Sequence, residues 1–523
     1  MKDENQRVGF DWRQTQRWLA IALLALAPFS FAPSVALPVL AFPSFRVGFY
    51  QLLLVTFVLL TFWLQRSVIW RQLSSNRWLQ LGAGGVVLVI INSLLVTLDL
   101  SRTLLLSSSV GLLVGASFSM YIYVKQLGAE QQFMQRAGGW IVGVGVIVAA
   151  VGIVQFVVGS FDQSVVADGL CEGCRGGVFG FPRINGFAIE PQFFANALLP
   201  AIFISLVQLV QSKKYKDESE EIKRSASQPA SQTPTTNYYL PSAKSYALAL
   251  LLITAFALSF SRGANLALAS GVIVLAIQLL RLGRAKQLLR ISAVLAGGYL
   301  LAATMMIGTN YLQFRDENPR IVAETFETLV EHGSAGLIEL SIRENTGRTS
   351  NVERQTSGAM GQSTNPKPLT PNPSSFAPPQ QIEASGDERL TAAKTGLGFL
   401  DNRRRALLGV GLGNLGPYAA SQDAGLPSNL TIYIQYALVV VEVGIIGLVL
   451  FVGVHGTAAW RVFKRAVADN LFELALGAVM VSFMVQYFFY GTYINTTYIW
   501  VYLGLALGLS ARPSEKVLQS QPQ

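Results

Sequence analysis

The chain has 523 residues, of which 51% are hydrophobic and 13% are charged. Soluble globular proteins are about 25% charged, so this chain has too few charges to cover the surfaces of soluble domains of its total length. The net charge of +10 does not indicate nucleic-acid binding, because Lys and Arg fall in short clusters between apolar runs and no nucleic-acid motif accompanies them. The composition therefore predicts a membrane protein.

Apolar runs recur from residue 18 to residue 510. A membrane helix needs about 20 mostly apolar residues, and about twelve runs meet this requirement. We therefore expect an all-α polytopic membrane protein with about twelve transmembrane helices. The first run contains prolines and no small-residue cleavage site, so we interpret it as a membrane helix and not as a signal peptide. The expected helices lie at 18–38, 47–64, 79–98, 103–124, 138–159, 193–211, 245–260, 264–281, 291–308, 431–453, 471–489 and 493–510.

The loops between these runs alternate in their content of Lys and Arg. Cytoplasmic loops of membrane proteins carry an excess of these residues, which predicts that both termini lie in the cytoplasm. On the opposite side, the shorter loops hold few basic residues, namely Arg46, Arg102, Arg175, Arg183 and Arg262.

The membrane part falls into two blocks. Residues 1–308 hold the first nine expected helices, and residues 431–523 hold the last three and a cytoplasmic tail. Within the first block, the cytoplasmic loop at about 212–244 is charged and then rich in Ser, Pro, Gln and Thr. This composition predicts disorder.

A long outer (periplasmic) loop at 309–430 separates the two blocks. We expect short amphipathic helices at 321–330 and 387–400. Between them, the stretch at about 345–385 is rich in Ser, Thr, Asn, Gln and Pro, which predicts partial disorder. A glycine-rich turn, GVGLGNLGPY at 409–418, closes the loop.

Two outer segments contain polar residues beside membrane helices. Arg183 and Glu190 precede the sixth expected helix, and Arg262 lies in a tight turn between the seventh and eighth. An arginine outside opposes the positive-inside rule, and its planar fork suits bidentate binding of a phosphate or diphosphate. The alternative is that Arg262 caps helix carbonyls or extends to lipid headgroups.

A third outer segment runs from Arg389 through the glycine turn into the tenth expected helix. Glu442 lies about 17 Å into that helix, at about 1.5 Å per residue. A carboxylate at that depth is costly and indicates either a functional group or a structural ion pair. The glycine spacing matches a dinucleotide pattern, but no βαβ unit surrounds it. We therefore expect a turn near a ligand, or simply a loop.

Cys171 and Cys174 lie in an outer loop, where thiols tend to oxidise, so we expect a local disulfide. A redox role is possible, but the chain has no second cysteine pair to support it. A structural zinc site would need four ligands, and only these two cysteines lie together. His332 and His455 have no neighbouring ligand residues, and we expect both to be structural.

At these same segments the chain resembles the O-antigen polymerase and ligase family, which acts on lipid-linked glycans at the outer face of bacterial inner membranes. The order and spacing of the shared residues, and the long outer loop, fit that family. The shared residues are Arg183, Gly186, Glu190, Pro191, Ser261, Arg262, Gly263, Arg389, Gly409, Gly411, Gly413, Asn414, Glu442, Gly444 and Gly447.

The resemblance implies a glycosyltransferase in the bacterial inner membrane with its site facing the periplasm. It implies a polyprenyl-diphosphate-linked glycan as donor, a glycan or lipid as acceptor, inversion at the anomeric carbon, and no metal or other cofactor. A chain-length regulator or a flippase is the implied protein partner. The implied catalytic residues are Arg183, Arg262 and Glu190. The implied substrate-binding residues are Arg389, Gly411, Gly413, Asn414, Asn429 and Glu442.

One departure from the family bears on the acceptor. Ligase members commonly have a histidine before an asparagine where this chain has Ser428 and Asn429, which favours a polymerase that joins repeat units into surface polysaccharide. An O-antigen ligase and a protein O-oligosaccharyltransferase stay open. So does a transporter of an anion or a lipid-linked sugar, which Glu442 would suit, although the chain shows no internal repeat of the kind common in transporters.

Overall fold

The computed structural model describes most of the predicted membrane helices. The described residues are 11–30, 34–36, 46–126, 131–161, 177–178, 181–182, 184–188, 190–211, 243–314, 322–323, 325–326, 380–422, 432–465, 471–489 and 497–511. Several residues named above lie outside these ranges, namely Arg183, Asn429, Cys171, Cys174 and His332.

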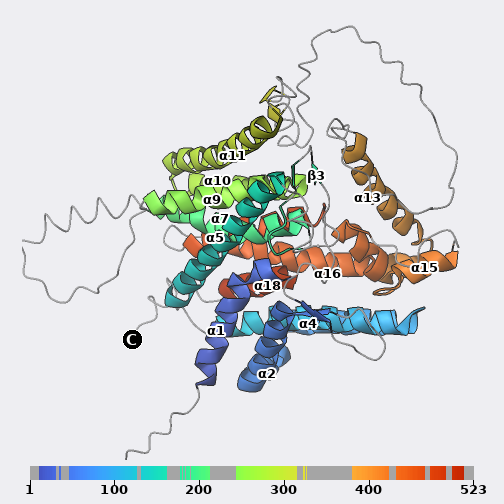
Figure 1. The fold of residues 1–523 in the computed structure, drawn as a ribbon. Helices are drawn as coiled ribbons and strands as arrows, with labels where there is room; N and C mark the ends of the chain where they lie inside the picture. The colour runs from blue at the N-terminus through green and yellow to red at the C-terminus, as the bar shows by residue number, and fades with distance from the viewer. Residues whose placement is uncertain are drawn as a thin grey trace, which may run out of the picture.

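Helices dominate the described residues (Figure 1). The helices are α1 (Trp12–Ala25), α2 (Phe49–Ser75), α3 (Arg77–Leu95), α4 (Leu100–Gln126), α5 (Gln131–Phe161), α7 (Pro191–Gln211), α9 (Ala243–Ala257), α10 (Arg262–Arg281), α11 (Ala285–Phe314), α13 (Gln380–Gly398), α14 (Arg403–Leu408), α15 (Leu415–Gln422), α16 (Gln435–Arg465), α17 (Leu471–Gln486) and α18 (Thr497–Ser510). Two antiparallel strand pairs accompany them, β1 (Ser34–Ala36) with β2 (Arg46–Gly48), and β3 (Gly177–Val178) with β4 (Phe181–Pro182).

Among the described residues, seven helices are long and apolar enough to cross a membrane: α2, α4, α5, α7, α10, α11 and α16. Shorter apolar helices of 10–17 residues lie in α3, α9, α17 and α18. Every range expected to form a membrane helix contains a helix. The helical, membrane-protein architecture therefore agrees with the sequence. The count of about twelve crossings, the outer loop and the orientation stay predictions.

The first expected helix, at 18–38, is wrong beyond Ala25. α1 begins after Asp11, whose carboxylate accepts hydrogen bonds from two backbone N–H groups of the first turn. Beyond Ala25 the chain forms a short 3-10 turn that contains Pro28. Proline lacks the N–H that an α-helix needs and clashes with the preceding turn. The chain then enters β1, which pairs with β2 directly before α2.

The expected helix at 387–400 is present but starts earlier, as α13 at Gln380. The partial disorder expected at about 345–385 stays a prediction. The helix follows a Pro-Pro pair directly, and its first residues include the good helix formers Gln, Glu and Ala. At 321–330, the described residues 322–323 and 325–326 are helical.

α7 is the central helix of the bundle. Of its most apolar 18-residue stretch, 94% is buried, and it packs against α5, α9, α10 and α17. Figure 1 shows α5, α7, α9 and α10 side by side. In contrast, α2, α3 and α11 expose large apolar side chains, including Trp70, Leu81 and Leu289. Such faces suit contact with lipid.

Candidate functional site

Arg262 opens α10 at the turn that follows α9. Phe260, two residues earlier, has φ 52, a left-handed conformation that is unfavourable for an aromatic residue and must be held by its surroundings. Ser261 caps α10, because its hydroxyl accepts a hydrogen bond from Ala264 N at 3.3 Å. Arg262 is half-buried and is the first residue of α10, at the positive end of the helix dipole.

Glu190 stands at the start of α7. Its carbonyl accepts hydrogen bonds from Phe193 N at 3.1 Å and Phe194 N at 3.2 Å, and the residue is half-buried. Gln155 fixes the loop before it, with Gly186 N donating to Gln155 Oε1 at 2.8 Å and Gln155 Nε2 donating to Gly186 O at 3.0 Å. Gly186 has φ 55, and a Cβ there would overlap the Phe194 ring. These contacts fix the backbone on both sides of Glu190.

Three segments far apart in the sequence meet at Phe489, just after α17. A Cβ on Gly263 would lie 2.6 Å from Phe489 Cβ and 2.9 Å from Gln192 Nε2, so the start of α10 touches both the start of α7 and the end of α17. Arg389 Nη1 donates to Phe489 O at 3.1 Å, and its guanidinium lies 5.9 Å from the centre of the Tyr433 ring. We call this place the Phe489 corner: Gln192, Gly263, Arg389, Tyr433 and Phe489, with the chain neighbours Glu190 and Arg262.

The Phe489 corner combines charges that favour an anion. The N-termini of α7 and α10 each carry roughly half a positive charge, and Arg262 and Arg389 add two full charges. Glu190 supplies a carboxylate, a group able to accept a proton. The contact of Arg389 with Phe489 O is a helix-end carbonyl cap, which is the structural role considered above as the alternative for Arg262. Substrate binding by Arg389 stays a prediction.

The central helices bury side-chain amides close to the corner. Gln192 and Asn196 lie one turn apart on α7, and Gln486 ends α17; all three are at least nine-tenths buried. Within the described residues, Gln192 Nε2 and both amide atoms of Asn196 have no hydrogen-bond partner, whereas the Gln486 amide lies beside the Tyr498 hydroxyl. An unpaired buried polar group costs about 1–3 kcal/mol, so these amides mark a place that suits water or a polar ligand. The sequence analysis missed them, although amides four residues apart at the start of an apolar run were a usable signal.

The glycine turn is bonded to a break in α16. Gly444 has φ 77 inside that helix, which frees carbonyls of the preceding turn. Val410 N donates to Val441 O at 2.8 Å, and Gly411 N donates to Glu442 O at 2.9 Å. A Cβ on Gly444 would overlap the backbone of residues 407–408. The glycines therefore allow two backbones to touch inside the bundle.

Glu442 and Asn414 complete this attachment. Glu442 is 3% exposed, its Oε1 accepts from Gly413 N at 3.1 Å, and Arg102 lies close enough to act on it electrostatically. Asn414 is fully buried, and its Oδ1 accepts from Leu98 N at 3.1 Å. The polar groups of the turn thus hold the end of α3, the start of α4 and α16 together. Their expected role in substrate binding stays a prediction.

α13 connects the glycine turn with the Phe489 corner. Arg389 contacts Phe489 O, whereas Gly396 packs against Ile432 and Val441. Gly396 lies seven positions after Arg389, which corresponds to about 10 Å along the helix. The structure therefore groups Glu190, Arg262 and Arg389 at one place, and Gly411, Gly413, Asn414 and Glu442 at a second.

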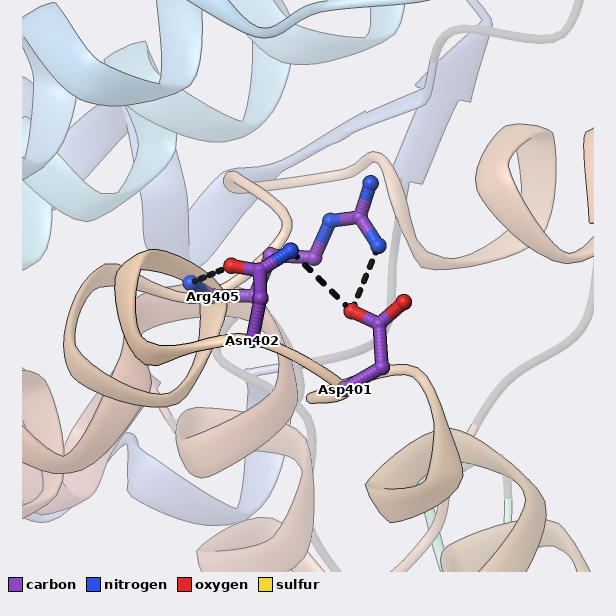
Figure 2. A network of polar contacts seen from close by, with 3 residues as sticks. All are labelled: Asp401, Asn402 and Arg405. Atoms are coloured by element: carbon purple, nitrogen blue, oxygen red, sulfur yellow. Dashed lines mark hydrogen bonds and ion pairs between the residues drawn. The ribbon is translucent and has the colours of Figure 1, made fainter.

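The turn between α13 and α14 is fixed by a small polar network that the sequence analysis missed. Figure 2 shows Asp401 Oδ1 accepting from Arg405 Nη1 at 2.6 Å and from Asn402 Nδ2 at 3.1 Å. Asn402 Oδ1 caps α14 by accepting from Arg405 N at 3.0 Å. The Arg405 guanidinium also lies 4.9 Å from the centre of the Tyr418 ring. This network orients the chain that leads into the glycine turn.

His455 is buried, and its Nδ1 contacts Phe451 O at 2.8 Å, which agrees with the structural role expected for it. In the described ranges, no group of three His, Cys, Asp or Glu side chains is placed to hold a metal ion.

Comparison with protein-family models gave no match, and comparison with curated proteins gave none either. The resemblance to O-antigen polymerases and ligases therefore rests on the motifs in the sequence.

Proposed function

We propose that the protein is a membrane glycosyltransferase that joins polyprenyl-diphosphate-linked repeat units into surface polysaccharide, as an O-antigen polymerase does. The observation that carries the proposal is the Phe489 corner. Two helix N-termini meet there beside Arg262 and Arg389, with Glu190 at the start of α7. Such a place suits a diphosphate.

The chemistry matches these groups. A bond forms between the anomeric carbon of the donor and a hydroxyl oxygen of the acceptor, and the bond from that carbon to the diphosphate breaks. Negative charge builds on the departing polyprenyl diphosphate, where fixed guanidinium donors and helix N-termini stabilise it. The acceptor hydroxyl loses its proton to Glu190. Arg183, a short distance before Glu190 in the chain, is the proposed second diphosphate ligand.

Polymer formation is proposed over ligation because Ser428 replaces the histidine common in ligases. The site would face the periplasm of a bacterial inner membrane, which is where the positive-inside pattern puts Arg262. The partners proposed are a lipid-linked donor, a glycan or lipid acceptor, and a chain-length regulator or a flippase.

A transporter is the second candidate, because α16 is interrupted at Gly444 beside the buried Glu442. Discontinuous helices form ion and substrate sites in many transporters. Here, however, Val410 N and Gly411 N already bond the carbonyls before the break. This arrangement favours a structural role for the interruption.

One experiment separates the two candidates. The purified full-length protein is reconstituted in liposomes with a polyprenyl-diphosphate-linked repeat unit on the protein's outer side only. A transferase releases polyprenyl diphosphate and lengthens the glycan without moving it across the bilayer. Movement of an unchanged donor to the lumen, with no product, would refute the transferase and support the transporter.

A further inference from the structure

Two exposed aromatic rings border the Phe489 corner. Phe488 is 58% exposed, and Tyr433, itself part of the corner, is 39% exposed. Phe488 directly precedes Phe489 in the chain. The centre of the Tyr433 ring lies 5.9 Å from the guanidinium of Arg389, which donates to Phe489 O at 3.1 Å. Both rings therefore adjoin the groups that we propose for the donor diphosphate.

The protein fixes the position of both rings. Gln435 N donates to Tyr487 O at 3.0 Å, so the chain that enters α16 is bonded to the segment that ends α17. The centre of the Tyr436 ring lies 4.5 Å from that of the Phe488 ring across this junction. Tyr433 belongs to the same entering segment, two residues before Gln435. Because the rings are already ordered, a ligand that binds them loses little free energy to ordering them.

The surroundings of these rings differ from the lipid-facing surface of the same helix. Farther along α16 the exposed side chains are aliphatic, including Ile445 and Val449, and such side chains suit lipid tails. Exposed aromatic rings are common at the membrane boundary, where they contact headgroups. Here, however, the rings adjoin the Arg389 guanidinium and the charged groups of the corner. Apolar ring faces beside charged hydrogen-bonding groups suit a ligand that has both a C–H face and hydroxyls, which is a sugar.

On the basis of the transferase function proposed above, we infer that Tyr433 and Phe488 form the surface that binds the acceptor glycan, with the pyranose ring of its terminal sugar lying on them. The donor carries a diphosphate, which the charges of the corner hold. The reacting end of the acceptor is a neutral sugar, so its binding depends on uncharged contacts. The C–H groups of a pyranose face supply such contacts, because they pack against the electron-rich face of an aromatic ring.

Saturation-transfer NMR of the full-length protein in detergent measures this binding without the transfer reaction. The probe is the repeat-unit oligosaccharide released from the lipid-linked donor by mild acid, which carries no diphosphate. The double substitution Tyr433→Leu and Phe488→Leu should weaken its binding about twofold to tenfold per ring. In a transfer assay with this oligosaccharide as acceptor, the acceptor KM should rise by the same factor, whereas the donor KM should stay unchanged. A rise in the donor KM in place of the acceptor KM would contradict the assignment to the acceptor.

The matched control is the double substitution Phe49→Leu and Tyr311→Leu, which removes two rings that are each 48% exposed on the same predicted face but outside the corner. A conservative pair, Tyr433→Phe and Phe488→Tyr, keeps both rings and should bind the oligosaccharide as the wild type does. Equal binding in the leucine and control variants, or an equal loss in the conservative pair, would overturn the inference and leave the transferase function intact. Ring-dependent binding without any transfer by the wild type would confirm the sugar-binding surface and refute the transferase.

Discussion

Replacing Gly263 by alanine is the sharpest structural perturbation of the Phe489 corner. The new Cβ would lie 2.6 Å from Phe489 Cβ and 2.9 Å from Gln192 Nε2. Carbon atoms in contact prefer about 3.5–4.0 Å, so the end of α17 must move by about 1 Å. Overpacking of this kind costs about 1–3 kcal/mol. Because the same displacement moves the Phe489 carbonyl that Arg389 holds, transfer activity should fall by roughly a hundredfold.

The matched control is Gly143→Ala in α5, where a Cβ would meet nothing within 4 Å and alanine favours the helix by about 0.5–1 kcal/mol. Both variants are purified in the same detergent. Their unfolding free energies are measured in mixed micelles. Their transfer rates are measured with the lipid-linked repeat unit as donor. If Gly263→Ala is as stable and as active as Gly143→Ala, then α7, α10 and α17 do not meet as described.

Three further predictions concern orientation, the thiols and the glycine turn. Reporter fusions near residue 285 should report cytoplasm and those near 370 the outside, as the positive-inside rule requires; a cytoplasmic result at 370 would reverse the proposed face of the site. Replacing Cys171 and Cys174 by serine should lower the unfolding free energy modestly and leave transfer intact, whereas loss of transfer in a folded variant would show that the thiols act in the reaction. Glu442→Gln keeps an acceptor for Gly413 N but loses the charge, so unfolding should become easier by about 0.5–2 kcal/mol with near-normal transfer rates; a folded, inactive variant would place this carboxylate in the mechanism.

The sequence predicts the helices well because the bilayer imposes a simple rule: about 20 apolar residues per crossing. The same rule explains the error at 18–38. Apolar content continues past Ala25, but the backbone cannot remain helical through Pro28. Hydropathy reports burial in lipid and contains no information about the missing N–H.

The candidate site is only partly predictable from the sequence. Arg262 and Glu190 stand out because polar groups beside membrane helices are costly, but nothing local indicates that Gly263 touches Phe489 or that Arg389 caps its carbonyl. Such contacts depend on how helices pack.

The role of Glu442 was also only partly predictable from the sequence. Its depth indicated a function or an ion pair, and the structure shows its carboxylate accepting from a backbone N–H of the glycine turn. The hydrogen-bond donor, Gly413 N, lies in the glycine turn, which the sequence also indicated as a candidate part of the site. This hydrogen bond depends on the break in α16 at Gly444. A single glycine in a long apolar run does not predict such a break.

The transfer rates of Arg262 variants show whether this guanidinium holds the diphosphate. Arg262→Lys keeps the charge but loses the paired donors, and a charge-assisted hydrogen bond contributes about 1.5–3 kcal/mol. We therefore expect a loss of roughly tenfold to hundredfold per contact in correctly folded Arg262→Lys protein. The loss in Arg262→Ala should be larger, and the losses at Arg183 and Arg262 should be non-additive. Arg403→Lys, at an exposed arginine of α14 on the same predicted face, should remain fully active. Full polymerising activity in Arg262→Ala would remove Arg262 from the mechanism and make the transporter a serious alternative again.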